Sequence, residues 1–332
     1  MNSGNLKDLL QHNSESSRTV PDILQKRFLF TSRAREFFRN RGYLEVETPA
    51  LSPYATLDAN IASFDTVFRH TPLYLQTSPE YYMKELLTMG FERIFQICKV
   101  FRNDETGPMH NPEFTMLEWY CTGHDYRFMM DETEDLVCGL AGEAADKWKR
   151  PFERLSVRDV FSGTTGMDLG RCLDYDALRK EAVNRDVGVT GSDGWDDIFF
   201  KLFLTYVEPS LSGRPVFLYD YPVKLGAMAR PCPDSPGFAE RFELYIKGCE
   251  LCNGYSELND SAVQRARFEH DLEARKRSGL PVPMINERFL SILPHMPDCT
   301  GNALGVDRLF MVINGLESIH EILPFGMKNH GL

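Results

Sequence analysis

The chain has 332 residues, of which 42% are hydrophobic and 26% charged, and its formal net charge is −11. This composition predicts a soluble globular protein with a sizeable core, built as one large domain or two smaller ones. Apolar runs fall short of the ~20 residues that span a membrane. The negative balance argues against a large nucleic-acid footprint, because such binding depends on neutralising phosphates.

The first twenty residues are rich in serine and asparagine and predict a flexible tail, which leaves 21–332 as the expected catalytic domain. The tail lacks a basic stretch followed by an apolar core, so a secretory signal is not predicted and a cytoplasmic location is expected. In that compartment the eight cysteines would be reduced thiols.

The first half of the chain predicts helices and strands in alternation. Pro21-Asp22 is typical of a helix start and Gly42 of a helix stop. The expected elements are a helix over 22–41, a strand over 43–49, a strand over 73–80 running into a helix that ends at Gly90, a strand–loop–strand unit over 94–120, and a helix over 125–147.

The second half begins with residues 150–215, which mix helix signals with glycine and serine and are interpreted as an insertion. The remaining expected elements are a strand over 215–222, a strand pair over 241–258, a charged amphipathic helix over 260–279, and a glycine-containing turn running into a helix over 300–315. Strands in runs with helices outside them predict an α+β fold with a mainly antiparallel sheet.

The most polar stretch joins two apolar, strand-like runs. It lies within FRNDETGPMHNPEFTMLEWY (101–120) and contains Arg102, Asn103, Asp104, Glu105, His110, Asn111 and Glu113. An arginine binds phosphate well because its fork is planar, permanently charged and bidentate. Arg102, with His110 and the later Arg308, therefore predicts a site for several phosphate oxygens. Taken alone, an RNDE run is more often a solvated turn.

Two glutamates and two glycines also suit a site that binds phosphates. Glu243 and Glu250 are hard oxygen donors of the kind that hold Mg²⁺ together with substrate phosphates. Their odd spacing would point them to opposite faces of a flat strand, so a bend or bulge near Gly248 is expected to bring them together. Gly301 and Gly305 are interpreted as bracketing a turn that lets backbone approach a base or a phosphate.

Cys249 and Cys252 have CxxC spacing, but the chain carries no second such pair. In an extended segment the two thiols would point to opposite faces. Neither a metal nor a redox role is therefore expected for them.

Together these features resemble the catalytic domain of class II aminoacyl-tRNA synthetases, specifically the lysyl branch, over roughly residues 20–327. The helix over 22–41 and YLEVETP resemble motif 1, with Pro49 as its proline, and FRNDETGPMHNPEFTMLEWY resembles motif 2. GNALGVDRL resembles motif 3, with Arg308 as its arginine, and NGYSELND is similar to a run of the lysyl enzymes. The motif 1 resemblance implies a homodimer.

The resemblance implies ATP and Mg²⁺ as cofactors and assigns roles to individual residues. The implied catalytic residues are Arg102 and Arg308. The implied ATP contacts are Arg102, Asn103, Asp104, His110, Asn111, Glu250, Leu251, Gly305 and Arg308. The implied amino-acid contacts are Ser78, Pro79, Glu80, Glu118, Tyr120, Asn253, Glu257 and Ala303, and the implied Mg²⁺ ligands are Glu243 and Glu250. The motif 2 carboxylate is usually glutamate, so either Asp104 or Glu105 could make that contact.

About twenty residues precede motif 1, too few for the anticodon-binding OB-fold of lysyl enzymes. This arrangement resembles the elongation factor P β-lysine ligases, which activate (R)-β-lysine with ATP and transfer it to a lysine of elongation factor P. Ser78 and Ala303 stand where lysyl-tRNA synthetases tend to carry alanine and glycine, and one methyl-sized change biases selection by about 1–3 kcal/mol. The resemblance thus implies elongation factor P as partner, with tRNA and membranes not expected.

Two other functions remain open from the sequence. One is a stand-alone lysyl-tRNA synthetase-like enzyme that activates α-lysine, and the net charge argues against it. The other is a non-catalytic regulator, which the joint presence of Arg102, Glu243, Glu250 and Arg308 argues against. The base for the transfer step and the acceptor lysine are not assigned.

Overall fold

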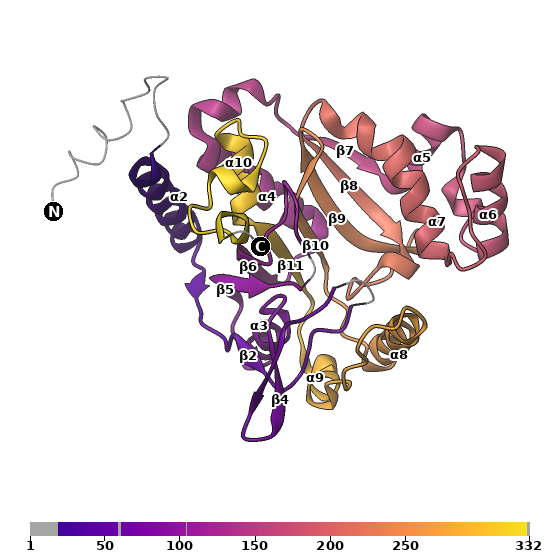
Figure 1. Ribbon diagram of the computed structural model, residues 1–332, viewed down its shortest axis with the longest axis horizontal. Helices are drawn as coiled ribbons and strands as arrows, with labels where there is room; N and C mark the ends of the chain where they lie inside the picture. The colour runs from indigo at the N-terminus through magenta and orange to yellow at the C-terminus, as the bar shows by residue number, and fades with distance from the viewer. Residues whose placement is uncertain (1–18, 59–60, 104, 331–332) are drawn as a thin grey trace.

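The computed structural model describes residues 19–58, 61–103 and 105–330. These residues fold around an eight-stranded sheet, mainly antiparallel, with parallel pairs at its two ends (Figure 1). Across the sheet the strands are β1 (Leu44–Glu45), β5 (Arg93–Phe101), β6 (Glu113–Thr122), β11 (Cys299–Gly305), β10 (Cys249–Ser256), β9 (Phe238–Ile246), β8 (Val216–Pro222) and β7 (Glu153–Ser156). The α+β expectation is confirmed.

One face of the sheet is covered by α2 (Val20–Asn40), α4 (Tyr126–Ala141) and α10 (Val306–Ile313). Thr19 caps α2, and its side chain accepts a hydrogen bond from the backbone N–H of Asp22. Phe38 of α2 stacks on Phe95 of β5 and packs edge-on against Trp119 of β6. This apolar cluster fixes the first helix on the sheet. Residues 1–18 of the expected tail lie outside the described residues.

The other face carries the helices α3 (Glu80–Thr88), α8 (Ser261–Arg277) and α9 (Glu287–Ile292), which share a second apolar cluster. A three-stranded sheet of β2 (Leu51–Ser52), β4 (Thr71–Leu75) and β3 (Asp65–Phe68) lies beside them. Within the described ranges, no helix combines the length and the apolar character needed to cross a membrane.

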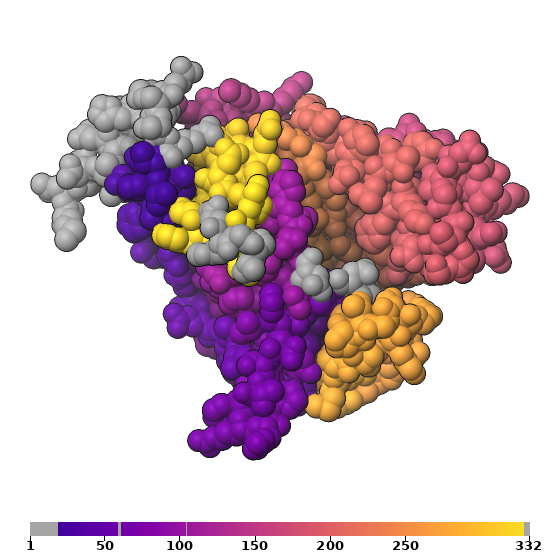
Figure 2. Space-filling view, viewed as in Figure 1, coloured from indigo at the N-terminus to yellow at the C-terminus, as the bar shows by residue number. Residues whose placement is uncertain are grey.

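Residues 150–215, expected as an insertion, add β7 to the sheet and form a distinct lobe (Figure 2). The lobe contains α5 (Val157–Thr165), α6 (Tyr175–Asn184) and α7 (Trp195–Leu202), which pack with β8 and β9 in a third apolar cluster. The short helical segments of the chain are η1 (Gly142–Lys147), η2 (Leu169–Arg171), η3 (Phe203–Val207), η4 (Glu208–Ser212), η5 (Val223–Leu225), η6 (Leu293–His295), η7 (Ile319–Glu321) and η8 (Met327–His330).

The strand pair expected over 241–258 is the β9–β10 hairpin, which turns at Lys247 and Gly248, both with positive φ. The expected bend near Gly248 is this turn. A register shift between Glu250 and Cys252 then adds a bulge that the sequence did not locate. Because Glu250 pairs with Tyr245, two residues from Glu243 on β9, the turn alone places Glu250 and Glu243 on one face of the sheet.

The same bulge corrects the expectation for Cys249 and Cys252. Cys249 pairs with Ile246 and Cys252 with Leu244, two residues that share one face of β9. Both thiols therefore enter the same apolar cluster instead of opposite faces. Among the described residues, no group of three or more histidines, cysteines or carboxylates could hold a metal ion.

Two other expectations were wrong in detail. Gly301 and Gly305 do not bracket a turn, because both lie in the central strand β11. Glycine is used there for close packing, since a Cβ on Gly301 would lie 2.4 Å from the ring of Tyr120. The strand expected over 43–49 is reduced to the two residues of β1.

Candidate active site

Pairing across four neighbouring strands places predicted site residues side by side. Ala303 of β11 pairs with Glu118 of β6 on one side and with Asn253 of β10 on the other, and Asn253 pairs with Glu243 of β9. Directly paired residues share a face of the sheet. The register therefore brings four residues that are distant in sequence to one level of one face.

This face forms the floor of a cavity of about 440 Å³. The predicted residues that line it are Ser78, Glu80, Arg102, His110, Asn111, Glu118, Tyr120, Glu243, Glu250, Leu251, Asn253, Glu257, Ala303, Gly305 and Arg308. Pro79 precedes α3 and Asn103 bridges to Ala62, and neither lines the cavity. Asp104 lies outside the described residues.

Arg308 anchors the cationic end of the cavity. Its guanidinium donates to the backbone oxygens of Met109 and Glu250, at 3.1 and 3.0 Å, and to Nε2 of His110 at 2.5 Å. Burial and the nearby Arg308 lower the pKa of His110, which keeps the imidazole neutral and able to accept. The motif 2 loop and the motif 3 helix are thus joined at this point.

Arg102 lies at the same end, immediately after β5. Its guanidinium stands 5.2 Å from the centre of the Phe114 ring and 3.6 Å from a carboxylate oxygen of Glu105. Its Nε is buried and has no hydrogen-bond partner among the described residues. An unmet donor on a permanent cation favours an anionic ligand such as a phosphate.

The two acidic residues expected to hold Mg²⁺ differ in their surroundings. Glu243 accepts hydrogen bonds from Arg241, Tyr221 and Tyr245 at 2.5–2.7 Å, so its oxygens are already engaged. Glu250 faces the cavity, and burial together with Glu243 raises its pKa to about 7. A buried, mutually repelling carboxylate pair beside a phosphate site fits a divalent cation, with Glu250 as its more open ligand.

Asn111 also lines this end, but its amide is bonded within the protein. Its Nδ2 donates to the backbone oxygen of Glu113 at 2.5 Å, and its Oδ1 accepts from the backbone N–H of Met327 at 3.1 Å. The side chain therefore holds the motif 2 loop against the C-terminal segment.

The opposite end of the cavity is acidic and deeply buried. Tyr120 donates its hydroxyl to Glu118 Oε1 at 2.7 Å, while Glu118 Oε2 is buried without a hydrogen-bond partner among the described residues. Burial and the neighbouring Glu80 raise the pKa of Glu118 to about 8, and burial also raises that of Glu257 to about 8. Such a group of carboxylates favours an ammonium ligand.

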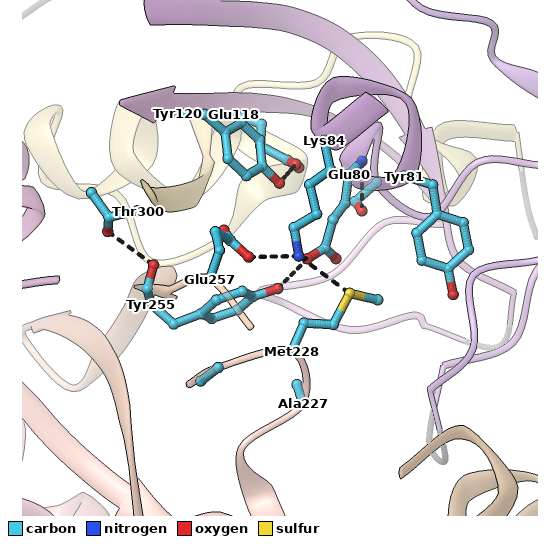
Figure 3. A network of polar contacts seen from close by, with 12 residues as sticks. Glu80, Tyr81, Lys84, Glu118, Tyr120, Ala227, Met228, Tyr255, Glu257 and Thr300 are labelled. Atoms are coloured by element: carbon cyan, nitrogen blue, oxygen red, sulfur yellow. Dashed lines mark hydrogen bonds and ion pairs between the residues drawn. The ribbon is translucent and has the colours of Figure 1, made fainter. Parts of the chain in front are cut away.

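Sequence reasoning missed Lys84, which lies on α3 between these acids (Figure 3). Its Nζ is 2.6 Å from Glu80 Oε1 and 2.6 Å from Glu257 Oε2, and the residue is fully buried. Tyr255, also missed, donates its hydroxyl to Glu80. The i, i+4 spacing of Glu80 and Lys84 was visible in the sequence, but it is usually found on exposed helix surfaces.

Comparison with known proteins shows the family. Residues 11–329 match the family described as tRNA synthetases class II (D, K and N). The chain belongs to this family. It is 38% identical to a protein of Pasteurella multocida (strain Pm70), over 96% of the chain and 99% of that protein, and 40% identical to one of Haemophilus influenzae (strain PittGG), over 95% and 98%. Both relatives are named elongation factor P–(R)-beta-lysine ligase, and the resemblance found in the motifs is confirmed.

In this member of the class II family the three motifs meet around Arg308. The motif 1 helix α2 contributes Arg27, whose guanidinium lies 2.5 Å from Asp307 of motif 3. Asp307 also accepts a hydrogen bond from the backbone N–H of Thr115 in motif 2, at 2.7 Å. Asp307 is buried directly before Arg308 and so fixes the start of α10 and the position of that arginine.

Proposed function

We propose that this protein activates (R)-β-lysine with ATP as an aminoacyl-adenylate and transfers it to a lysine side chain of elongation factor P, in the cytoplasm and as a homodimer. One observation carries the proposal: a single cavity joins the cations Arg102 and Arg308 to the buried acids Glu118 and Glu257. The first pair suits the phosphates of ATP and the second suits the ammonium of a lysine-like chain. The names of the relatives supply the substrates.

In the first step a carboxylate oxygen of the amino acid attacks the α-phosphorus of ATP, and pyrophosphate leaves. In this proposal Arg102 would orient the α-phosphate and the carboxylate, and Arg308 with His110 would bind the outer phosphates. Glu250 and Glu243 would hold Mg²⁺, which would supply neutralisation of the charge on the phosphates. Positioning and charge stabilisation are sufficient, because the substrate itself provides the nucleophile.

In the second step the neutral amine of the acceptor lysine attacks the carbonyl carbon of the mixed anhydride. The new amide bond forms, the carbonyl carbon–oxygen bond to the phosphate breaks, AMP leaves, and the amine loses a proton. The net charge of −11 opposes a polyanionic tRNA as acceptor over an extended interface.

The assembly proposal rests on the exposed side of α2. Val20, Leu24 and Phe28 are spaced by four residues, so they form one stripe, and each is 45–64% exposed. An apolar stripe on the motif 1 helix favours contact with a second copy of the chain.

The test uses elongation factor P from the same organism, incubated with the enzyme, ATP, Mg²⁺ and (R)-β-lysine. Intact-mass spectrometry should show a gain of one lysyl unit on the protein. Acid-gel analysis of tRNA-Lys in the same mixture should show uncharged tRNA. Charged tRNA with unmodified protein would overturn the proposal and favour a lysyl-tRNA synthetase-like activity.

A further inference from the structure

The amino-acid end of the cavity already contains an ammonium group. Lys84 is 0% exposed, and its Nζ bridges Glu80 and Glu257 at 2.6 Å each (Figure 3). The Sδ of Met228 lies 3.3 Å from Nζ and the ring of Tyr255 5.3 Å from it. Although burial alone would lower the pKa of Lys84, Glu257 and Glu80 raise it above its ordinary value, so the group is charged.

The ion pairs of Lys84 engage one oxygen each of Glu80 and Glu257 and leave other carboxylate oxygens of the site without a partner among the described residues. Glu80 Oε1 accepts from both Lys84 and Tyr255, which fixes this carboxylate. Glu257 Oε1 and Glu118 Oε2 are buried without hydrogen-bond partners among the described residues. Two acceptors thus remain for a ligand, and both belong to residues that line the cavity.

Gly301 lets one of these acceptors, Glu257 Oε1, pack directly against the strand β11. A Cβ at this position would lie 2.4 Å from Glu257 Oε1 and 2.4 Å from Cε1 of Tyr120. The absent side chain lets the carboxylate and the phenol ring approach each other across β11. Glu257 Oε1 and the Tyr120 ring therefore both lie against the backbone of β11 at the cavity wall.

The charges of the site match a particular class of ligand. Glu80, Glu118 and Glu257 bring three negative charges when ionised, and Lys84 offsets one of them. The remaining formal charge of −2 favours a ligand that carries ammonium groups, such as a diamino acid. Buried like charges destabilise a site unless cations compensate them. Each cation of the protein in the site therefore lowers by one the positive charge that the site favours in a ligand.

We propose that Lys84 is a resident ammonium group that sets the specificity of the amino-acid site: it neutralises one of three carboxylates, fixes Glu80 and Glu257, and leaves Glu257 Oε1 and Glu118 Oε2 for the terminal ammonium of a diamino acid. Lys84 is thus a positioning residue. The inference rests on the proposed binding of a lysine-like amino acid, and it does not depend on the acceptor of the second step.

The test compares native enzyme with K84M, which keeps the length of the side chain and removes its charge. Calorimetry measures the binding of (R)-β-lysine and α-lysine at pH 7 and pH 8.5, and ATP binding serves as a control of the fold. Without Nζ the carboxylates hold protons more tightly at neutral pH. The affinity of K84M relative to native should fall by at least about 30-fold at pH 7 and recover about tenfold at pH 8.5, while ATP binding is retained.

A double variant separates charge matching from simple structural support. K84M/E80Q restores the formal charge of −2, so it should bind a diamino acid about tenfold more tightly than K84M at pH 7. K276M is the matched control, because Lys276 is exposed on α8 and its removal should change nothing. If K84M does not fold, the double variant is compared with E80Q, and the proposal predicts that the double variant binds at least as tightly.

Three results would overturn the inference. The first is an affinity of K84M for the amino acids within about threefold of the native value at pH 7, and the second is an equal loss of affinity at pH 7 and pH 8.5. The third is a double variant that binds the amino acids more weakly than the single variant with which it is compared. If native enzyme binds neither amino acid, both the role of Lys84 and the proposed amino-acid substrate are overturned. Failure to modify elongation factor P alone would contradict the proposed acceptor and leave the role of Lys84 standing.

Discussion

At the scale of single residues, Glu250 has the surroundings of a metal ligand. It faces the cavity, its backbone oxygen accepts from Arg308, and burial with Glu243 raises its pKa to about 7. E250Q should lower Mg²⁺-dependent pyrophosphate exchange by at least about 100-fold, because one charged ligand is lost. Circular dichroism should show a native fold, and E153Q, at an exposed strand position, is the control. Exchange near the native rate would contradict the metal assignment.

Ala303 tests how the pocket distinguishes related amino acids. It lies at the level of Glu118 and Asn253 on the cavity floor, so its methyl group would lie beside the amino acid in the proposed complex. A303G should shift the ratio of kcat/KM for α-lysine over (R)-β-lysine by about tenfold towards α-lysine. Pyrophosphate exchange with each amino acid measures this ratio. An unchanged ratio would mean that position 303 does not contact the part of the substrate where the two amino acids differ.

The sequence could predict those residues whose side chains are of an unusual type for the segment of the chain in which they occur. A run with arginine, histidine and carboxylates between two apolar strands indicated Arg102 and His110, and the cavity contains both. Lys84 gave no such signal, since a lysine in a short amphipathic helix is usually solvated. Its burial depends on Glu257 of a segment more than 170 residues later. Only the tertiary structure brings the two together.

At the scale of elements, sequence predicted the strands and helices around the site but not their registers. Alternation and turn residues located the β9–β10 pair, whereas the bulge after Glu250 depends on pairing with β9. Glycines at 301 and 305 read as a turn because glycine weakens strands. In β11 the close packing of Tyr120 and Glu257 against Gly301 outweighs the low preference of glycine for strands.

Helix α8, helix α7 and the segment that contains Asp58 each contribute an aspartate to an acidic cluster that lines the cavity. Asp271 of α8 lies near Asp58 and Asp196 of α7, with Arg267 and Arg275 also close. Burial and then the two aspartates raise the pKa of Asp271 to about 7, above its ordinary 3.8. Its contribution to stability is therefore present below about pH 4 and lost as pH rises through 7.

D271N should consequently stabilise the protein at pH 8 and have little effect at pH 4. The expected gain in the free energy of unfolding at pH 8 is about 1–3 kcal/mol, because the variant carries no buried negative charge. Thermal unfolding followed by circular dichroism at both pH values measures it. E269Q, an exposed position of the same helix, is the control. A variant less stable than native at pH 8 would contradict the raised pKa.

At the scale of the whole molecule, α2 connects the surface to the active site. Its inner side holds Arg27 against Asp307, next to Arg308, while its outer side exposes Leu24 and Phe28. A partner copy that packs on the outer side would restrict movement of the helix and so hold Arg27 in place. The proposed dimer and the geometry of the phosphate site are then parts of one arrangement.

The double variant L24E/F28E should therefore be monomeric and less active. Charges on the exposed stripe oppose burial between two copies without affecting the inner side of the helix. Sedimentation at about 10 µM should give a dimer for native protein and a monomer for the variant, with pyrophosphate exchange reduced by about tenfold or more. L204E is the matched control, because Leu204 is 55% exposed in the lobe formed by 150–215. A native protein that sediments as a monomer and is fully active would contradict both the dimer and its link to the site.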